Sequence, residues 1–212
     1  VNKTKTVAMT AATVSGSVVS SVQEFADLPT TFSVGDVHEI IGDQNNSFDN
    51  YFVKALSANT YEETVKPGII YQLDNTTLPH SLVLTAGSFA FDRQTYADRG
   101  AGDLDSAPNP SFVGRKINNI FFYKNRLGLL SDENVIFSEA SEFFNFFPTT
   151  VTAVLDNAPI DVSVSHTKVS ILKHAIPFND SLTLFSDSTQ FTLETNGILT
   201  PKTISIIPST EF

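Results

Sequence analysis

Seven of the eighteen phenylalanines in this chain lie within the 27 residues from Phe121 to Phe147. Side chains of this size are usually buried, either inside a core or against another surface. Residues 125–147 read NRLGLLSDENVIFSEASEFFNFF, with no nucleophile beside a base, no metal-ligand spacing and no phosphate-binding glycine loop. The segment therefore predicts a packing and assembly motif, with its phenylalanines either in a core or at a subunit interface.

The second half of this motif is predicted to be a short helix. Ser138 is placed to cap it, and Glu139 and Glu142 would lie on its solvated face near the first turn. The helix would carry the last four phenylalanines of the cluster. It would end at Pro148, because proline cannot continue a helix.

Short apolar runs rich in β-branched and aromatic residues recur along the rest of the chain. The predicted strands span residues 37–41, 50–56, 61–65, 69–73, 82–85, 116–123, 126–130, 135–137, 150–154, 160–165, 169–174, 181–185 and 190–194. Turn residues separate them, as at 131–134 and 186–188, and one more helix is predicted at 20–28. The fold class is therefore mainly β, with short antiparallel strands in sheet-like or propeller-like domains and one or two short helices.

Five further strings accompany the motif, and together they resemble one protein family. They are TYEETVKPGIIYQLDNTTLPHSLV, DRGAGD, PSFVGRKIN, APIDVSVSHTKVSILKHAIPF and LFSDSTQFTLE, which begin at residues 60, 98, 110, 158 and 184. In this order they resemble the tail tubular protein B family, the tail-nozzle proteins of short-tailed phages of the autographivirus type. The resemblance covers roughly residues 25–207. Family members are much longer, so the chain looks like an internal segment of such a protein.

The resemblance implies a structural virion protein, assembled in the host cytoplasm and located in the phage tail. It implies a homo-oligomeric ring, a hexamer, that encloses the DNA ejection channel and contacts the tail adaptor and the tail fibres. Double-stranded DNA would pass through transiently, and no cofactor is implied. The candidate packing or interface residues of the family motif are Arg126, Gly128, Phe143, Phe144, Asn145, Phe146 and Phe147.

The chain is predicted to divide near residue 105. Residues 100–110 read GAGDLDSAPNP, and this mixture of Gly, Pro, Asp and Asn is typical of a linker or exposed loop. Residues 1–105 would form a platform-like, mainly-β part that could be incomplete. Residues 106–212 would form a β-rich, propeller-like part that carries the aromatic motif.

The net charge of −10 bears on the partners of the chain. Residues 1–106 carry 13 acidic and 6 basic side chains, and residues 107–212 carry 10 and 7. Grip on a nucleic-acid backbone depends on Lys and Arg, so this chain is not expected to hold DNA. Two interpretations stay open: the charge serves solubility, or it forms an acidic wall along which DNA slides.

Catalytic and metal-binding patterns are weak. His38, His80, His166 and His174 have no ligand-like spacing, and the serines and Asp161 before His166 lie on one predicted strand without a nucleophile elbow. Asp98, Asp103 and Asp105 could hold calcium in a loop, but they lack the spacing of an EF-hand. No catalytic, cofactor-binding or metal-binding residue is therefore predicted.

A second function class is kept as the alternative. Tail proteins can carry hydrolases that degrade host polysaccharide, and such enzymes need two carboxylates roughly 5 to 9.5 Å apart across a cleft. The chain has no cysteine, which excludes disulfides and thiol catalysis, and no apolar run approaches the ~20 residues of a membrane span. A cleft with two converging carboxylates would favour the hydrolase.

Overall fold

The computed structural model describes residues 5–42, 50–57, 60–167, 169–195 and 197–211. Within these ranges the fold is mainly β, with three four-stranded sheets, a separate two-stranded hairpin and one 3-10 turn at Phe25–Asp27. The predicted fold class is confirmed: the sheets are small, mostly antiparallel and not closed into a barrel. No helix in the described ranges is long and apolar enough to cross a membrane.

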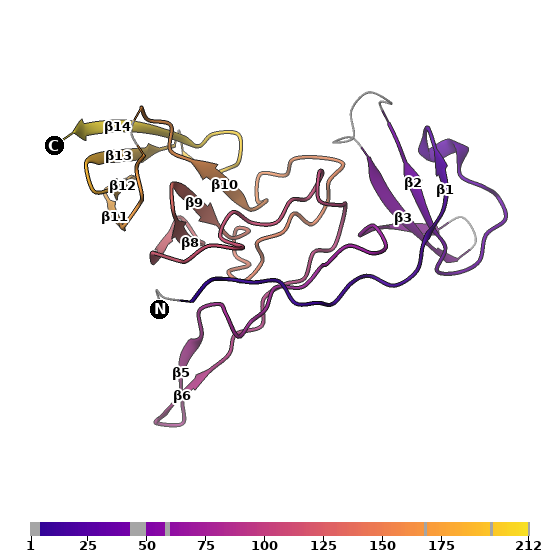
Figure 1. The fold of residues 1–212 in the computed structure, drawn as a ribbon, viewed down its shortest axis with the longest axis horizontal. Coiled ribbons are helices and arrows are strands. Elements are labelled where there is room, and N and C mark those ends of the chain that lie inside the picture. The colour runs from indigo at the N-terminus through magenta and orange to yellow at the C-terminus, as the bar shows by residue number, and fades with distance from the viewer. Residues whose placement is uncertain (1–4, 43–49, 58–59, 168, 196, 212) are drawn as a thin grey trace.

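The first sheet lies at one end of the molecule (Figure 1). Its strands, in spatial order, are β1 (Val18–Val22), β2 (Val37–Ile40), β3 (Tyr51–Ser57) and β4 (Thr60–Thr64). The strands predicted at 37–41, 50–56 and 61–65 are confirmed to within one or two residues. The helix predicted at 20–28 is wrong, because its first residues, which belong to the β-branched run Val18–Val22, pair in parallel with β2.

A hairpin of β5 (Ser81–Thr85) and β6 (Ser88–Asp92) projects away from the rest of the molecule (Figure 1). Its two-residue turn places Ala86 at φ 50° and Gly87 at φ 83°, and positive φ at both positions is what a type I′ turn requires. The sequence predicted β5 but not β6. The strand predicted at 69–73 is also wrong, since that segment makes only isolated bridges.

The aromatic motif builds the third sheet. Its antiparallel strands are β7 (Asn119–Tyr123), β8 (Arg126–Ser131), β9 (Asn134–Phe137) and β10 (Ile160–Ser163), in the order β10-β9-β8-β7. Lys124 and Asn125 both have positive φ in the β7–β8 turn, and the predicted turn at 131–134 has Asp132 at φ 48°. The strands predicted at 116–123 and 160–165 are confirmed with shorter ends, and those predicted at 126–130 and 135–137 are each one residue longer.

The last sheet is a meander in sequence order. Its strands are β11 (His174–Phe178), β12 (Ser181–Phe185), β13 (Thr189–Glu194) and β14 (Ser205–Glu211). The predicted turn at 186–188 is confirmed, because the Ser186 amide donates to the Thr189 carbonyl at 2.9 Å. The strand predicted at 169–174 is wrong in position, since only His174 of that range is in a strand. Residues 150–154 form bends rather than the predicted strand.

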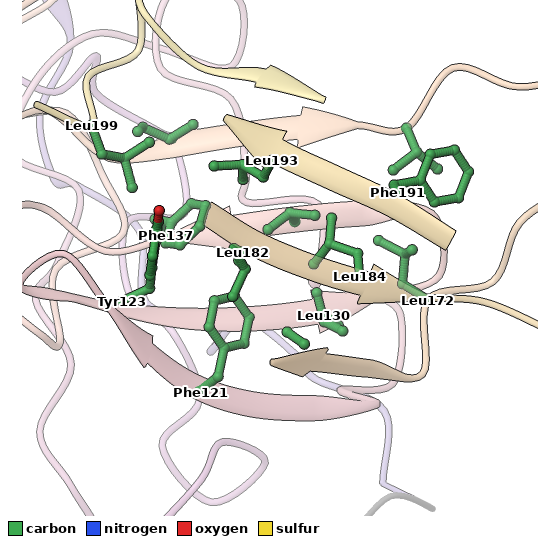
Figure 2. Packing of buried hydrophobic residues seen from close by; sticks show 14 residues of the cluster. Phe121, Tyr123, Leu130, Phe137, Leu172, Leu182, Leu184, Phe191, Leu193 and Leu199 are labelled. Carbon is green, nitrogen blue, oxygen red and sulfur yellow. The ribbon is translucent and has the colours of Figure 1, made fainter. Parts of the chain in front are cut away.

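Two hydrophobic cores cover the two faces of the third sheet. Side chains such as Phe121, Leu130 and Phe137 pack against Leu182 and Phe191 of the last sheet (Figure 2). Neighbouring residues on a strand point to opposite faces, so the other face builds a second core. The buried members of that core are Val7, Leu73, Leu78, Tyr96, Phe112, Ile117, Leu129, Ile136, Phe146 and Phe147. This second core contains residues from both sides of residue 105. The division of the chain into two parts near that residue stays a prediction.

Candidate functional site

The segment after β9 is a chain of turns and not the predicted helix. An isolated bridge joins Glu139 to Glu142, and Ser141 adopts a φ of 69°, which a right-handed helix does not allow. Ser138 does not cap a helix. Its hydroxyl accepts from the Leu127 amide and donates to the Glu139 carbonyl, each at 3.0 Å, and so ties the segment to β8.

Glu139 is buried, whereas the sequence placed it on a solvated face. Its carboxylate accepts from the side-chain amides of Asn145 and Asn157, each at 2.6 Å. The Asn145 carbonyl accepts from the Glu139 amide at 2.9 Å, and its side-chain oxygen accepts from the Phe147 amide at 3.0 Å. These hydrogen bonds, and not those of a helix, hold the segment in its conformation. Glu142 is exposed, as predicted.

Arg126 is the largest fully buried side chain in the described structure. Its two terminal nitrogens donate to five main-chain carbonyls at 2.7 to 3.2 Å, those of Ser138, Asp156, Asn157, Ala158 and Leu199. Burial lowers the pKa of Arg126, while the nearby Glu139 carboxylate acts in the opposite direction. The guanidinium therefore holds three separate chain segments against β8 as a structural cation.

Gly128 lies directly across the β7–β8 ladder from Phe121. A Cβ atom at Gly128 would overlap the Phe121 ring, so glycine is required here for space. The ring lies across the bare strand and meets Phe137 edge to face, with centroids 5.5 Å apart. The glycine of the motif thus positions an aromatic side chain of the first core (Figure 2).

We expect Gly128→Ala to destabilise the protein by about 1–3 kcal/mol, because the added methyl group has to displace the Phe121 ring from a packed core. Gly100→Ala is the matched control, since a Cβ there meets nothing within 4 Å, and it should change stability by less than about 0.5 kcal/mol. Urea denaturation measures both. Phe121→Leu should relieve part of the cost in the double variant, and equal losses for the two glycine variants would refute the steric explanation.

The four phenylalanines at 143–147 divide into two environments. Phe146 and Phe147 are buried in the second core, and the Arg99 guanidinium lies 4.9 Å from the Phe147 ring centroid. Phe144 is partly buried, and Phe143 is half-buried against Phe122, which is 50% exposed. Phe146 and Phe147 therefore pack inside the protein. A role of any of the four phenylalanines at a subunit interface stays a prediction.

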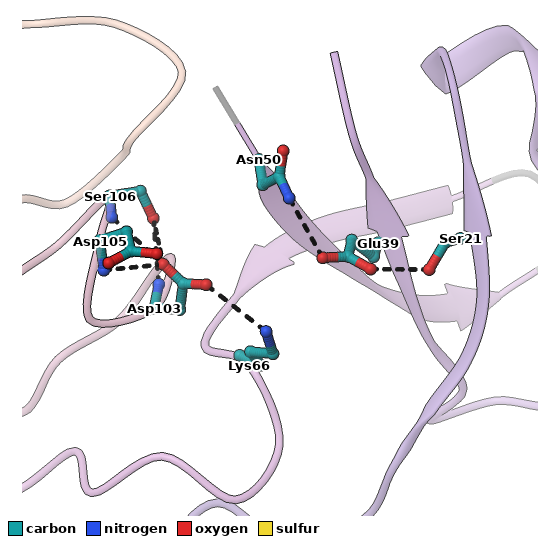
Figure 3. A network of polar contacts seen from close by, with 7 residues as sticks. All are labelled: Ser21, Glu39, Asn50, Lys66, Asp103, Asp105 and Ser106. Carbon is teal, nitrogen blue, oxygen red and sulfur yellow. Dashed lines mark hydrogen bonds and ion pairs between the residues drawn. The ribbon is translucent and has the colours of Figure 1, made fainter. Parts of the chain in front are cut away.

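The DRGAGD string forms an ordered loop in which the Asp103 carboxylate is bonded within the protein. One Asp103 oxygen accepts from the Asp105 amide and from the amide and hydroxyl of Ser106, and the other lies 3.6 Å from the Lys66 ammonium (Figure 3). Gly102 has a φ of 73° and no room for a Cβ. The described residues contain no group of three acidic or histidine side chains suited to a metal ion.

The remaining candidate residues lie apart from one another. His38 bonds Ser20 at 2.8 Å, His80 stacks on Phe91, His166 bonds Glu211 at 2.8 Å and His174 is 3.5 Å from Asn119. Asp161, considered as a triad member, instead accepts from the Ser111 amide and the Asn134 side chain. The structure therefore assembles no triad from the residues that the sequence suggested.

Several structural residues were missed by the sequence analysis. Glu63 accepts from the Thr150 hydroxyl at 2.6 Å and the Val151 amide at 2.7 Å, and this fixes the bends at 150–154. Arg99 is buried and donates to the Ile70 carbonyl at 2.7 Å and to the Asn109 side chain at 2.5 Å. The only available signal for Arg99 was its place in the DRGAGD string, because its partners lie 10 and 29 residues away.

Three surface cavities are possible sites for a ligand. A cavity of about 490 Å³ lies between Lys5, His80 and Phe91, and its lining contains no carboxylate. A second cavity, of about 260 Å³, has Asp161 as the one carboxylate in its lining. A third cavity, of about 420 Å³, has Asp156 as its one carboxylate. None of the three brings together the two carboxylates that glycoside hydrolysis requires.

The charged side chains of the site thus bond within the protein: Arg126 to main-chain carbonyls, and Glu139 to the side chains of Asn145 and Asn157. The chain is 39% identical over 197 residues to the tail tubular protein gp12 of Escherichia phage T7, which covers 92% of this chain. The chain spans about a quarter of the length of that relative, 25%. The profile of the family described as bacteriophage nozzle protein matches residues 1–212, and the chain therefore belongs to the bacteriophage nozzle protein family.

Proposed function

We propose that this chain is a structural part of a subunit of a phage tail nozzle. The observation that carries the proposal is the family match along all 212 residues, together with a relative named for a tail tube. The buried polar residues fit such a role. Arg126, Glu139 and Asn145 bond to the chain itself, which stabilises its irregular loops.

The proposed assembly is a closed ring of identical subunits, a hexamer, in the virion tail. The ring would be assembled in the host cytoplasm, contact the tail adaptor and the tail fibres, and surround the path of the ejected DNA. Residues 1–105 would supply a platform-like part. The two four-stranded meanders, β7–β10 and β11–β14, would be neighbouring blades of a propeller in the part that follows.

Electron microscopy of the full-length polypeptide that contains this chain tests the proposal. Closed rings with a central channel, and the same rings in purified tails, are the expected result. A full-length polypeptide that stays monomeric at high concentration and is absent from tails would contradict it. The hydrolase alternative has no support in the three cavities, and a polysaccharide cleavage assay with the same preparation checks it directly.

We expect no measurable binding of duplex DNA by the purified chain at physiological salt. With a net charge of −10, the chain repels phosphates, and DNA would slide past it. Fluorescence anisotropy with a labelled duplex measures this. Binding that weakens with salt, at a slope of about −0.9 per neutralised phosphate, would instead indicate a gripping or gating surface.

A further inference from the structure

The projecting hairpin has one face that is wholly apolar. Leu82 lies opposite Phe91 and Leu84 opposite Phe89, so all four side chains share one face of the two strands. Their exposed fractions are 62%, 68%, 59% and 70%. The other face carries Ser81, Val83 and Thr85 opposite Asp92, Ala90 and Ser88.

This apolar face is largely exposed in the described structure, and Phe91 at its base lines the first cavity together with Leu78 and Ile117. β5 and β6 pair only with each other in the described sheets, and the base of the hairpin is held by His80, which stacks on Phe91 at 5.4 Å. A lone two-stranded hairpin is only marginally stable in water. Large apolar surface on such an arm marks a binding surface, because its exposure would otherwise favour aggregation.

The hairpin carries no charge from Ser81 to Phe91, although the chain as a whole has a net charge of −10. A nucleic acid is a poor partner, since no Lys or Arg is present in the arm to meet a phosphate. Identical acidic copies repel each other, and they can come together at lowest cost where both surfaces lack charge. The uncharged arm can therefore approach a second copy of the chain without direct charge repulsion at the contact.

A surface of matching character exists on the same chain. The cavity of about 260 Å³ is an apolar groove lined mainly by prolines and small aliphatic side chains, with Asp161 as its one charged residue. Pro108, Pro148 and Pro159 form part of the lining, and Val154 at its rim is 58% exposed. β10, whose first residues belong to this lining, lies on the far side of the body from the hairpin tip (Figure 1).

We propose that the tip of the β5–β6 hairpin of one copy, with Leu84 and Phe89, docks into the apolar groove of the next copy, the groove lined by Pro108 and Val154. The inference rests on the proposed function, because a ring closes by a contact between two unlike patches of the same subunit. The hairpin and the groove are two such patches on different sides of the chain. The most exposed aromatic residue of the arm, Phe89, is the second residue after the turn and can enter the groove first.

Cysteine cross-linking tests this contact, and the 212 residues contain no cysteine of their own. Ser88→Cys at the hairpin tip and Ala153→Cys in the groove lining are introduced together into the full-length polypeptide, and each alone as a control. A short bismaleimide should yield covalent dimers and a ladder of larger species from the double variant only. Rings that form without this cross-link would overturn the docking contact alone, whereas the absence of rings would overturn the proposed function.

A paired substitution separates the two faces of the hairpin. Leu84→Thr with Phe89→Thr removes the apolar tip and places in the strands a β-branched residue that favours them. We expect ring assembly to weaken by at least about tenfold, with the melting temperature of the isolated subunit unchanged. Val83→Thr with Ala90→Thr, on the opposite face, is the matched control and should leave assembly unchanged. Equal effects of both pairs would refute the contact, and so would a lower melting temperature of the Leu84 and Phe89 variant, since its apolar tip would then be packed within its own polypeptide.

Discussion

Arg126→Met is expected to destabilise the protein by about 3–5 kcal/mol, a large part of the roughly 5–15 kcal/mol that holds a typical domain together. Methionine fills a similar volume but donates no hydrogen bond. The five main-chain carbonyls that accept from the guanidinium would lose a donor, and those of the buried residues Ser138 and Leu199 have little access to water as a substitute. Each unsatisfied buried acceptor costs about 1–3 kcal/mol, reduced where the loops relax toward solvent.

Urea denaturation of the variant, followed by circular dichroism, measures this loss. Arg126→Lys should recover only part of it, because an ammonium group has three donors and cannot reproduce the planar fork of arginine. Arg115→Met is the matched control: its side chain is 46% exposed and lies 3.6 Å from Asp132. That substitution should change stability by less than about 1 kcal/mol. Equal effects at Arg126 and Arg115 would refute a structural role for the buried guanidinium.

Phe147→Ala is expected to cost about 3–5 kcal/mol, because it leaves a cavity in the second core. The ring is buried among side chains from several segments of the chain and also lies under the Arg99 guanidinium. Its removal would expose that buried cation to a void in place of an aromatic face. Thermal melting of the variant should show a large drop or no cooperative transition.

Phe143→Ala is the companion substitution from the same cluster. Its ring is half-buried and meets only the exposed Phe122 among the aromatic contacts of the described residues. We expect it to cost clearly less stability than Phe147→Ala, and electron microscopy of assembled tails would show whether it acts between copies. Wild-type melting for the Phe147 variant would refute its place in the core.

Local sequence patterns determined most of the strands and turns. β-branched and aromatic runs, such as residues 119–123 and 134–137, form strands that bury side chains on a core, because alternating side chains need only a sheet to bury half of them. The turn at 186–188 depends on the Ser186 hydroxyl, which bonds the backbone of Ser188 and Thr189, and the turn at 131–134 has Asp132 at positive φ. The density of phenylalanines near residues 121–147 predicted either a core or a subunit interface, and the structure has two cores there.

The errors fall where a distant partner decides the local structure. Residues 138–147 satisfied the local signals for a capped helix, but the buried Glu139 carboxylate is held by Asn145 and Asn157, and Ser138 by Leu127. Residues 150–154 have the composition of a strand. The Glu63 carboxylate, 87 positions before Thr150, accepts hydrogen bonds from Thr150 and Val151 and so holds the segment in bends. Propensity is a weak preference of less than 1 kcal/mol per residue, and several such bonds outweigh it.

The sequence by itself determined the mainly-β fold, the phenylalanine-rich centre, the acidic charge and, through its ordered strings, the family. Only the tertiary structure decided why particular motif residues are needed. Arg126 bonds carbonyls as far away as Leu199, Gly128 makes room for Phe121 across a ladder, and the apolar hairpin is left uncovered. Each of these depends on contacts between segments far apart in the chain, which local periodicity and propensity do not encode.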